Sequence, residues 1–134
     1  MRYLLDTDTC IELMRGRELV SREVRLRSPE ELAISAMTLA ELHFGALRSS
    51  APERALLAID AFLSAPLAVV PFDTDAARDH ALIRHALRSE PIGERDIVIA
   101  ATARSRGLTV VTHNRRHFDR VAGIAVADWT VDPG

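Results

Sequence analysis

Five short apolar runs, separated by segments with helical character, limit this chain to a narrow class of folds. Each run spans three to five residues and ends at polar or turn residues, which is typical of buried strands. We expect strands at residues 2–6, 32–35, 67–71, 108–111 and 124–126. Strands that alternate with helices favour a parallel sheet covered by helices on both faces. The sequence therefore predicts an α/β fold.

The segments between the runs have helical start and stop signals. Pro52 stands where a helix begins, and Gly107 follows the end of another. Thr38 and Glu41 match the capping box S/T-x-x-E, which places a helix start at Thr38. We expect helices at residues 7–14, 18–26, 38–47, 53–63, 74–88, 94–105 and 115–118. With 134 residues and no linker or repeat, the chain is expected to form one domain over residues 1–134.

Composition excludes several classes of protein. The single Cys10 excludes an internal disulfide and a cysteine-rich zinc site. Asp6 and Asp8 interrupt the first apolar run, so no signal peptide is indicated, and no run is long enough to span a bilayer. We therefore expect a cytoplasmic protein. The net charge of −2 does not by itself indicate a nucleic-acid binder, although all seventeen basic residues are arginine.

Four acidic or amide residues stand where a predicted strand ends or a predicted helix begins. Asp6 follows the first strand, Glu41 lies in TLAEL, Asp96 in PIGERDIVIAA, and Asn114 follows LTVVTH. The carboxyl ends of parallel strands meet at one edge of a sheet, where such folds keep their sites. Three carboxylates and an amide at this edge would form an oxygen-rich site of the kind that holds Mg²⁺ or Mn²⁺.

Each of these residues also has an ordinary structural explanation. Asp6 and Asp8 can cap the following helix. Glu41 can complete the capping box, Asp96 can interact with the dipole of its helix, and Asn114 can be a turn residue. The coincidence of all four positions at one edge favours the site.

Other catalytic motifs are absent. The five histidines form no H-E-x-x-H pattern, no serine lies in G-x-S-x-G, and there is no glycine-rich phosphate loop. His113, beside Asn114, is a candidate for contact with phosphate. The segment LLDTDT also matches the start of a haloacid-dehalogenase-type phosphatase, but the chain lacks the lysine and the adjacent aspartate pair of those enzymes.

Three segments resemble the PIN-domain ribonucleases and, within them, the VapC-type toxins of type II toxin–antitoxin systems: LLDTDTCIELM, ISAMTLAELHFGALRS and PIGERDIVIAATARSRGLTVVTHNRRHFDRVAGIAVADW. The resemblance covers nearly the whole chain. It implies a three-layer α/β/α sandwich with a five-stranded parallel sheet. It also implies that Asp6, Glu41 and Asp96 bind Mg²⁺ or Mn²⁺, with Asn114 where the family often has a fourth acid.

The implied activity is cleavage of RNA by a metal-activated water, which leaves 5′-phosphate and 3′-hydroxyl ends. Without metal, the crowded carboxylates should raise at least one pKa. The chain departs from the family at Glu94 and Arg95, where a proline or a small residue is usual, and this changes the charge next to Asp96. Two alternatives stay open: a PIN nuclease that acts on DNA, and a non-catalytic PIN-like binding or regulatory protein.

The resemblance also implies partners. They are an RNA substrate, with tRNA or rRNA expected, a small VapB-like antitoxin, and a second copy in a homodimer. Candidate arginines for RNA are Arg15, Arg17, Arg115 and Arg116. The antitoxin is expected in an apolar groove for an amphipathic helix, formed by Cys10, Ile11, Leu13, Met14, Leu56, Leu57, Ile59, Phe62 and Leu63.

Overall fold

A computed structural model describes residues 1–132. Its five strands form one parallel sheet in the order β3-β2-β1-β4-β5, which confirms the predicted fold class. The strands are β1 (Tyr3–Leu5), β2 (Leu32–Ser35), β3 (Ala68–Val70), β4 (Thr109–Val111) and β5 (Val126–Ala127). The helices are α1 (Thr7–Met14), α2 (Glu18–Arg25), the 3₁₀ turn η1 (Pro29–Glu31), α3 (Ala36–Leu47), α4 (Pro52–Leu63), α5 (Thr74–Ala86), α6 (Glu94–Ser105) and α7 (Arg115–Phe118).

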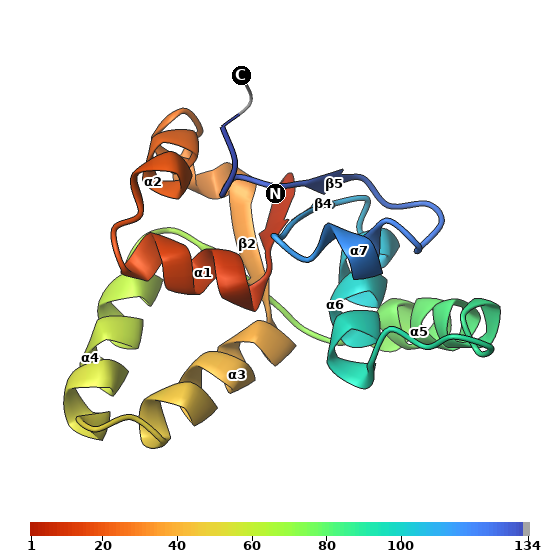
Figure 1. The fold of residues 1–134 in the computed structure, drawn as a ribbon, viewed down its shortest axis with the longest axis horizontal. Helices are drawn as coiled ribbons and strands as arrows, with labels where there is room; N and C mark the ends of the chain where they lie inside the picture. The colour runs from red at the N-terminus through yellow and green to blue at the C-terminus, as the bar shows by residue number, and fades with distance from the viewer. Residues whose placement is uncertain (133–134) are drawn as a thin grey trace.

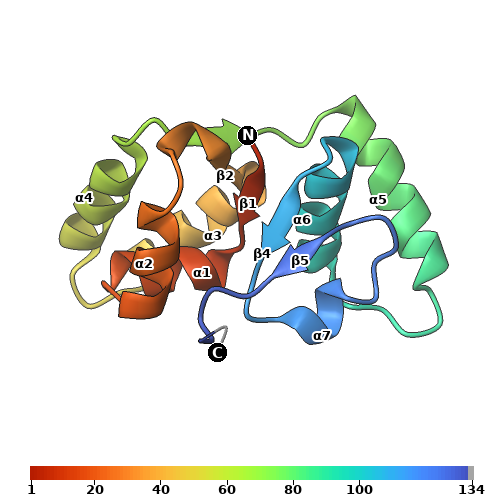
Figure 2. The ribbon, with the colours of Figure 1, turned by 90° about the horizontal axis from the view of Figure 1, so that it is seen from above.

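Helices cover both faces of the sheet, as the two views show (Figures 1 and 2). Adjacent residues of one strand supply the two cores, because successive side chains of a strand point to opposite faces. Leu4 belongs to the core under α5 and α6, whereas Leu5 belongs to the core under α1 to α4. Both leucines are fully buried, so β1 is covered on both sides and forms the middle of the domain.

The order of the strands in the sheet determines where the candidate site lies. From β1 the chain moves outward through β2 to β3, and it later returns to the other side of β1 with β4 and then β5. The carboxyl ends of β1, β2 and β4 therefore lie together, and α1, α3 and α7 follow these ends. A reversal of strand order beside the central strand is the usual position of a ligand site in an open parallel sheet.

Element boundaries differ from prediction mainly at α3. The helix begins at Ala36, two residues before the predicted start, because the Ser35 hydroxyl accepts a hydrogen bond from the Thr38 N–H at 3.0 Å. Thr38 is therefore inside the helix and buried. The predicted capping box of Thr38 and Glu41 is wrong. A capping box does form at η1, an element that we did not predict, from Ser28 and Glu31.

The other differences are small. The last strand is Val126–Ala127 rather than 124–126, and α5 ends at Ala86 rather than at residue 88. Among residues 1–132, no helix combines the length and the apolar character that a membrane span requires.

Candidate functional site

The four predicted site residues line one cavity at the carboxyl edge of the sheet. Asp6, Glu41, Asp96 and Asn114 come from four separate segments of the chain, and the cavity that they share has a volume of about 570 Å³. Its remaining lining residues are Thr7, Asp8, Ile11, Ile92, Gly93, Glu94, Arg95 and His117. The strand topology therefore brings together residues that are up to 108 positions apart, as we expected.

Asp6 is the most buried acid of the site, with 6% of its surface exposed. One carboxylate oxygen accepts the Thr7 N–H at 2.8 Å, so Asp6 does cap α1, and the other accepts the Thr112 hydroxyl at 2.8 Å. Burial, followed by the negative charge of Asp8 and more weakly that of Asp96, raises the pKa of Asp6 to about 7. The expected rise in at least one pKa is thus present at Asp6, where burial contributes more than the neighbouring charges, and burial also raises the pKa of Asp8.

Glu41 does not cap its helix but faces the cavity. It accepts a hydrogen bond from the Thr7 hydroxyl at 2.7 Å and pairs with the Arg95 guanidinium at 2.6 Å. The guanidinium of Arg95 is largely exposed, whereas the Glu41 side chain is mostly buried. The departure from the family at position 95 therefore places a positive charge directly on a predicted metal ligand.

Asp96 is held through only one of its oxygens. Oδ2 lies 2.6 Å from His117 Nδ1 and accepts a hydrogen bond from the Asn114 amide at 3.2 Å. Within residues 1–132, no hydrogen bond reaches Oδ1 of Asp96, although the residue lines the cavity. Asn114 thus positions a neighbouring acid, and one Asp96 oxygen is left for a ligand.

The donor types at this edge suit Mg²⁺ or Mn²⁺. Carboxylate oxygens are the preferred ligands of both ions, and a cation would offset the burial and the repulsion that together raise the pKa of Asp6. Within residues 1–132, however, no three His, Cys, Asp or Glu side chains are already arranged around a common metal position. An ion bound by Asp6, Glu41 and Asp96 would compete with the Arg95 guanidinium for the Glu41 carboxylate.

Several contacts of the site were not predicted. Thr7 and Thr112 support Asp6, Thr7 also supports Glu41, and His117 supports Asp96. His117 stands three residues after Asn114, one turn of α7, so its spacing could have indicated a shared face. The hydroxyl contacts of Thr7 with Glu41 and of Thr112 with Asp6 gave no such signal, because they join distant segments.

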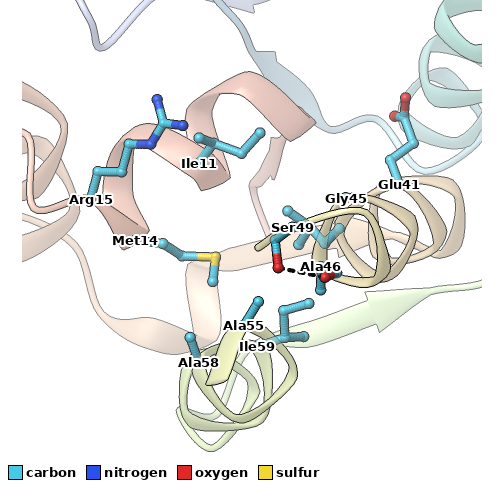
Figure 3. Close-up of a pocket in the computed structure, with 11 residues that line it drawn as sticks. Ile11, Met14, Arg15, Glu41, Gly45, Ala46, Ser49, Ala55, Ala58 and Ile59 are labelled. Carbon is cyan, nitrogen blue, oxygen red and sulfur yellow. Dashed lines mark hydrogen bonds between the residues drawn. The ribbon is translucent and has the colours of Figure 1, made fainter. Parts of the chain in front are cut away.

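A second, apolar cavity of about 320 Å³ opens between α1, α3 and α4 (Figure 3). Ile11, Met14 and Ile59 line it, as predicted. We did not predict the contribution of α3, which supplies Glu41, Leu42, Gly45 and Ala46, or that of Ser49, which follows the helix.

The other predicted groove residues do not line this cavity. Cys10 is fully buried in the core, and Leu13 and Phe62 line a smaller cavity elsewhere. The prediction is therefore wrong for Cys10, which a partner cannot reach. Contact of an antitoxin with the others, which are Leu13, Leu56, Leu57, Phe62 and Leu63, stays a prediction, because they do not line this cavity.

The four candidate arginines for RNA fall into two classes. Arg17 pairs with Glu12 at 3.3 Å, and Arg115 pairs with Asp119 at 3.4 Å. Arg15 and Arg116 are exposed and form no ion pair or hydrogen bond through their side chains within residues 1–132. These two arginines remain available to a ligand.

Comparison with known proteins gives consistent matches over almost the whole chain. The PIN domain model matches residues 3–124. The tRNA(fMet)-specific endonuclease VapC of Salmonella typhimurium is 41% identical over 131 residues, which cover 96% of this chain and 98% of that protein. Ribonuclease VapC2 of Haemophilus influenzae is 35% identical with the same coverage of 96% and 98%.

Comparison with solved structures gives matches to the same family. The VapBC complex of Salmonella typhimurium bound to DNA contains a chain that superposes with a TM-score of 0.90 at 41% identity, covering 96% of this chain and 98% of that one. VapBC-1 from nontypeable Haemophilus influenzae superposes with a TM-score of 0.88 at 30% identity, covering 98% and 100%. The chain therefore belongs to the PIN-domain family and, within it, to the VapC proteins.

Proposed function

We propose that this protein is a metal-dependent endoribonuclease and the toxin of a VapBC-type toxin–antitoxin pair. The observation that carries the proposal is the single cavity lined by Asp6, Glu41, Asp96 and Asn114. Relatives over nearly the full chain are named as ribonucleases or as a tRNA(fMet)-specific endonuclease, which supports RNA as the substrate. A structured RNA, tRNA or rRNA, is the proposed target.

Asp6, Glu41 and Asp96 would hold Mg²⁺ or Mn²⁺. When bound, the ion supplies an activated water and stabilises negative charge on the phosphate. The protein's own residues fix the ligands: Thr7 and Thr112 orient Asp6, and His117 with Asn114 orients Asp96. Such supporting contacts typically contribute roughly 10–100-fold in metal affinity or activity.

The proposed activity is tested with purified protein, RNA and DNA side by side. We expect the protein to cleave RNA with Mg²⁺ or Mn²⁺. Cleavage should stop with EDTA, because the acids alone repel the phosphate, and it should recover when the ion is restored. The Asp96→Asn variant, purified in the same way, controls for contaminating nucleases. RNA cleavage that is equal in the variant, or that persists in EDTA, would contradict the metal mechanism. Preferred cleavage of DNA would favour the DNA-acting alternative.

The proposed partner is a small VapB-like antitoxin whose amphipathic helix occupies the apolar groove of α1, α3 and α4. Figure 3 shows Met14, Ala55 and Ala58 directed toward this groove, which ends near Glu41 of the candidate site. A helix in this groove would therefore lie beside the cavity that it has to block. The similar chains of Salmonella typhimurium and Haemophilus influenzae come from structures of VapBC complexes, which supports the assignment. A homodimer remains part of the proposal.

An acidic residue in the groove should weaken this association. We expect Ala58→Glu to reduce co-purification of the antitoxin encoded by the adjacent gene by at least about tenfold, because burying an unpaired carboxylate against an apolar helix is costly. RNA cleavage should be retained. Ala81→Glu, at an exposed site on α5, is the matched control. Equal recovery of antitoxin with both variants would place the partner elsewhere.

A further inference from the structure

A second polar cleft adjoins the candidate active site. Its volume is about 480 Å³, and it is lined by Asp8, Ile11, Glu12, Arg15, His113 and Thr130. Asp8 and Ile11 line both this cleft and the cavity of the candidate site. A strand of nucleic acid that crosses the candidate site can therefore continue into the cleft.

His113 is held in the cleft by one side of its ring. Nδ1 lies 3.0 Å from Asp128 Oδ2 and 2.8 Å from the Thr130 hydroxyl oxygen. The Asp128 side chain is only 7% exposed, whereas the imidazole is 66% exposed. Nδ1 therefore carries a hydrogen, which Asp128 accepts, and Nε2 is the ring nitrogen that is left for a ligand. When His113 is the imidazolium, Nε2 also carries a hydrogen and can donate it. Within residues 1–132, Nε2 of His113 makes no hydrogen bond.

The segment that holds His113 is itself fixed. Asp128 and Thr130 flank Trp129, which is buried and packs against Tyr3 with ring centroids 5.1 Å apart. The Arg27 guanidinium lies over the Trp129 ring at 4.3 Å. The Thr130 N–H and hydroxyl also donate to Asp128 Oδ1, at 2.9 and 2.6 Å. The imidazole is therefore positioned in advance, which lowers the entropy lost on binding a ligand.

Arg15 brings a permanent positive charge to the same cleft. Figure 3 shows its guanidinium directed away from the groove residues Met14 and Ala58. The two acids of the cleft are already engaged. Glu12 pairs with Arg17, and Asp8 accepts hydrogen bonds from the Thr9 hydroxyl and the His113 N–H, each at 3.3 Å. The groups without a partner are thus Nε2 of His113 and the guanidinium of Arg15. The guanidinium, and Nε2 when His113 is the imidazolium, are donors that match the acceptor oxygens of a phosphate.

We propose that this cleft is a backbone-phosphate subsite, in which His113 Nε2 and the Arg15 guanidinium bind a phosphate that neighbours the one being cut. The inference rests on the proposed ribonuclease function, since it assumes that RNA occupies the candidate site. It gives His113 and Arg15 a role in substrate affinity, separate from the acids that carry out the reaction.

Two substitutions of His113 separate this role from a structural one. His113→Asn keeps a donor near the position of Nδ1, next to Asp128, but removes Nε2. His113→Gln places a donor near the position of Nε2. Arg15→Ala removes the other phosphate-binding group. The matched control is Arg84→Ala, at an exposed arginine of α5 whose side chain makes no ion pair or hydrogen bond within residues 1–132. All are made in the Asp96→Asn background, so that a fluorescein-labelled single-stranded RNA of mixed sequence can be titrated without cleavage.

We expect Arg15→Ala and His113→Asn each to raise the Kd for this RNA by roughly three- to tenfold. For Arg15→Ala, the slope of log Kd against log salt should also fall by about 0.7, because one permanent charge no longer neutralises a phosphate of the single strand. His113→Gln and Arg84→Ala should stay within about twofold of the parent. In the active background, KM should rise in the same order while kcat changes little.

The subsite is refuted if His113→Asn and Arg15→Ala bind the RNA as tightly as the parent and the salt slope of Arg15→Ala is unchanged. If the wild-type protein still cuts RNA in that case, the proposed function stands and only the subsite fails. If the wild-type protein neither binds nor cuts RNA, both proposals fail together.

Discussion

Replacing Asp6 with Asn is expected to stabilise the metal-free protein by about 2–4 kcal/mol at pH 8. In the folded protein, burial and the charges of Asp8 and Asp96 raise the pKa of Asp6 to about 7, from an ordinary value of 3.8. The native state therefore holds more protons than the unfolded state between about pH 4 and pH 7. The free energy of unfolding should fall as the pH rises through this window, and Asn removes that loss.

The measurement is urea denaturation with EDTA at several pH values. The wild-type and Asp6→Asn proteins should differ little near pH 4 and most at pH 8. Asp73→Asn is a suitable control, because Asp73 also caps a helix by accepting a backbone N–H, at 3.0 Å from Ala76, but lies outside the site. Equal stability of wild type and Asp6→Asn across this range would show that ionised Asp6 does not lower the free energy of unfolding.

The second large effect is expected for Asp96→Asn. Loss of a residue that hydrogen-bonds to a metal ligand typically lowers activity by roughly 10–100-fold. The loss for Asp96→Asn should be larger, because the variant loses the charge of a proposed ligand itself. The stability of the metal-free protein should be unchanged or raised. The Asn side chain is nearly isosteric, its oxygen can still accept a hydrogen bond from His117, and one source of repulsion for Asp6 is removed.

Thermal unfolding with and without Mn²⁺, together with an RNA cleavage assay, tests this expectation. The ion should raise the melting temperature of the wild-type protein more than that of the variant, since binding to the native state alone adds stability. A variant that melts clearly lower without metal and yet cuts RNA at the wild-type rate would identify Asp96 as a structural residue at the start of its helix.

Much of the fold could be predicted from local pattern. Short apolar runs located all five strands, although the last one is shifted from 124–126 to Val126–Ala127. The convergence of the four site residues followed from parallel topology alone. The capping box at Thr38 failed because Ser35 offers the same capping chemistry three residues earlier, and the glutamate at position 41 favoured the later of the two starts.

The contacts inside the site were beyond sequence analysis. Glu41 pairs with Arg95, 54 positions away, and Thr112 supports Asp6 across 106 positions. The wall that α3 and the residues just after it add to the groove was missed for a related reason. Gly45, Ala46 and Ser49 are small, so they form a groove by leaving space, and small residues give no amphipathic signal.

The apolar groove and the candidate site are built from different parts of the chain, and this has a consequence during synthesis. All lining residues of the apolar groove lie between Ile11 and Ile59, whereas the candidate site needs Asp96 and Asn114. A ribosome that makes this chain releases the groove segments first and the final acid and amide of the site last. A partner that recognises the groove could thus meet the nascent chain before the nuclease site is complete, so that the enzyme is bound as soon as it can act.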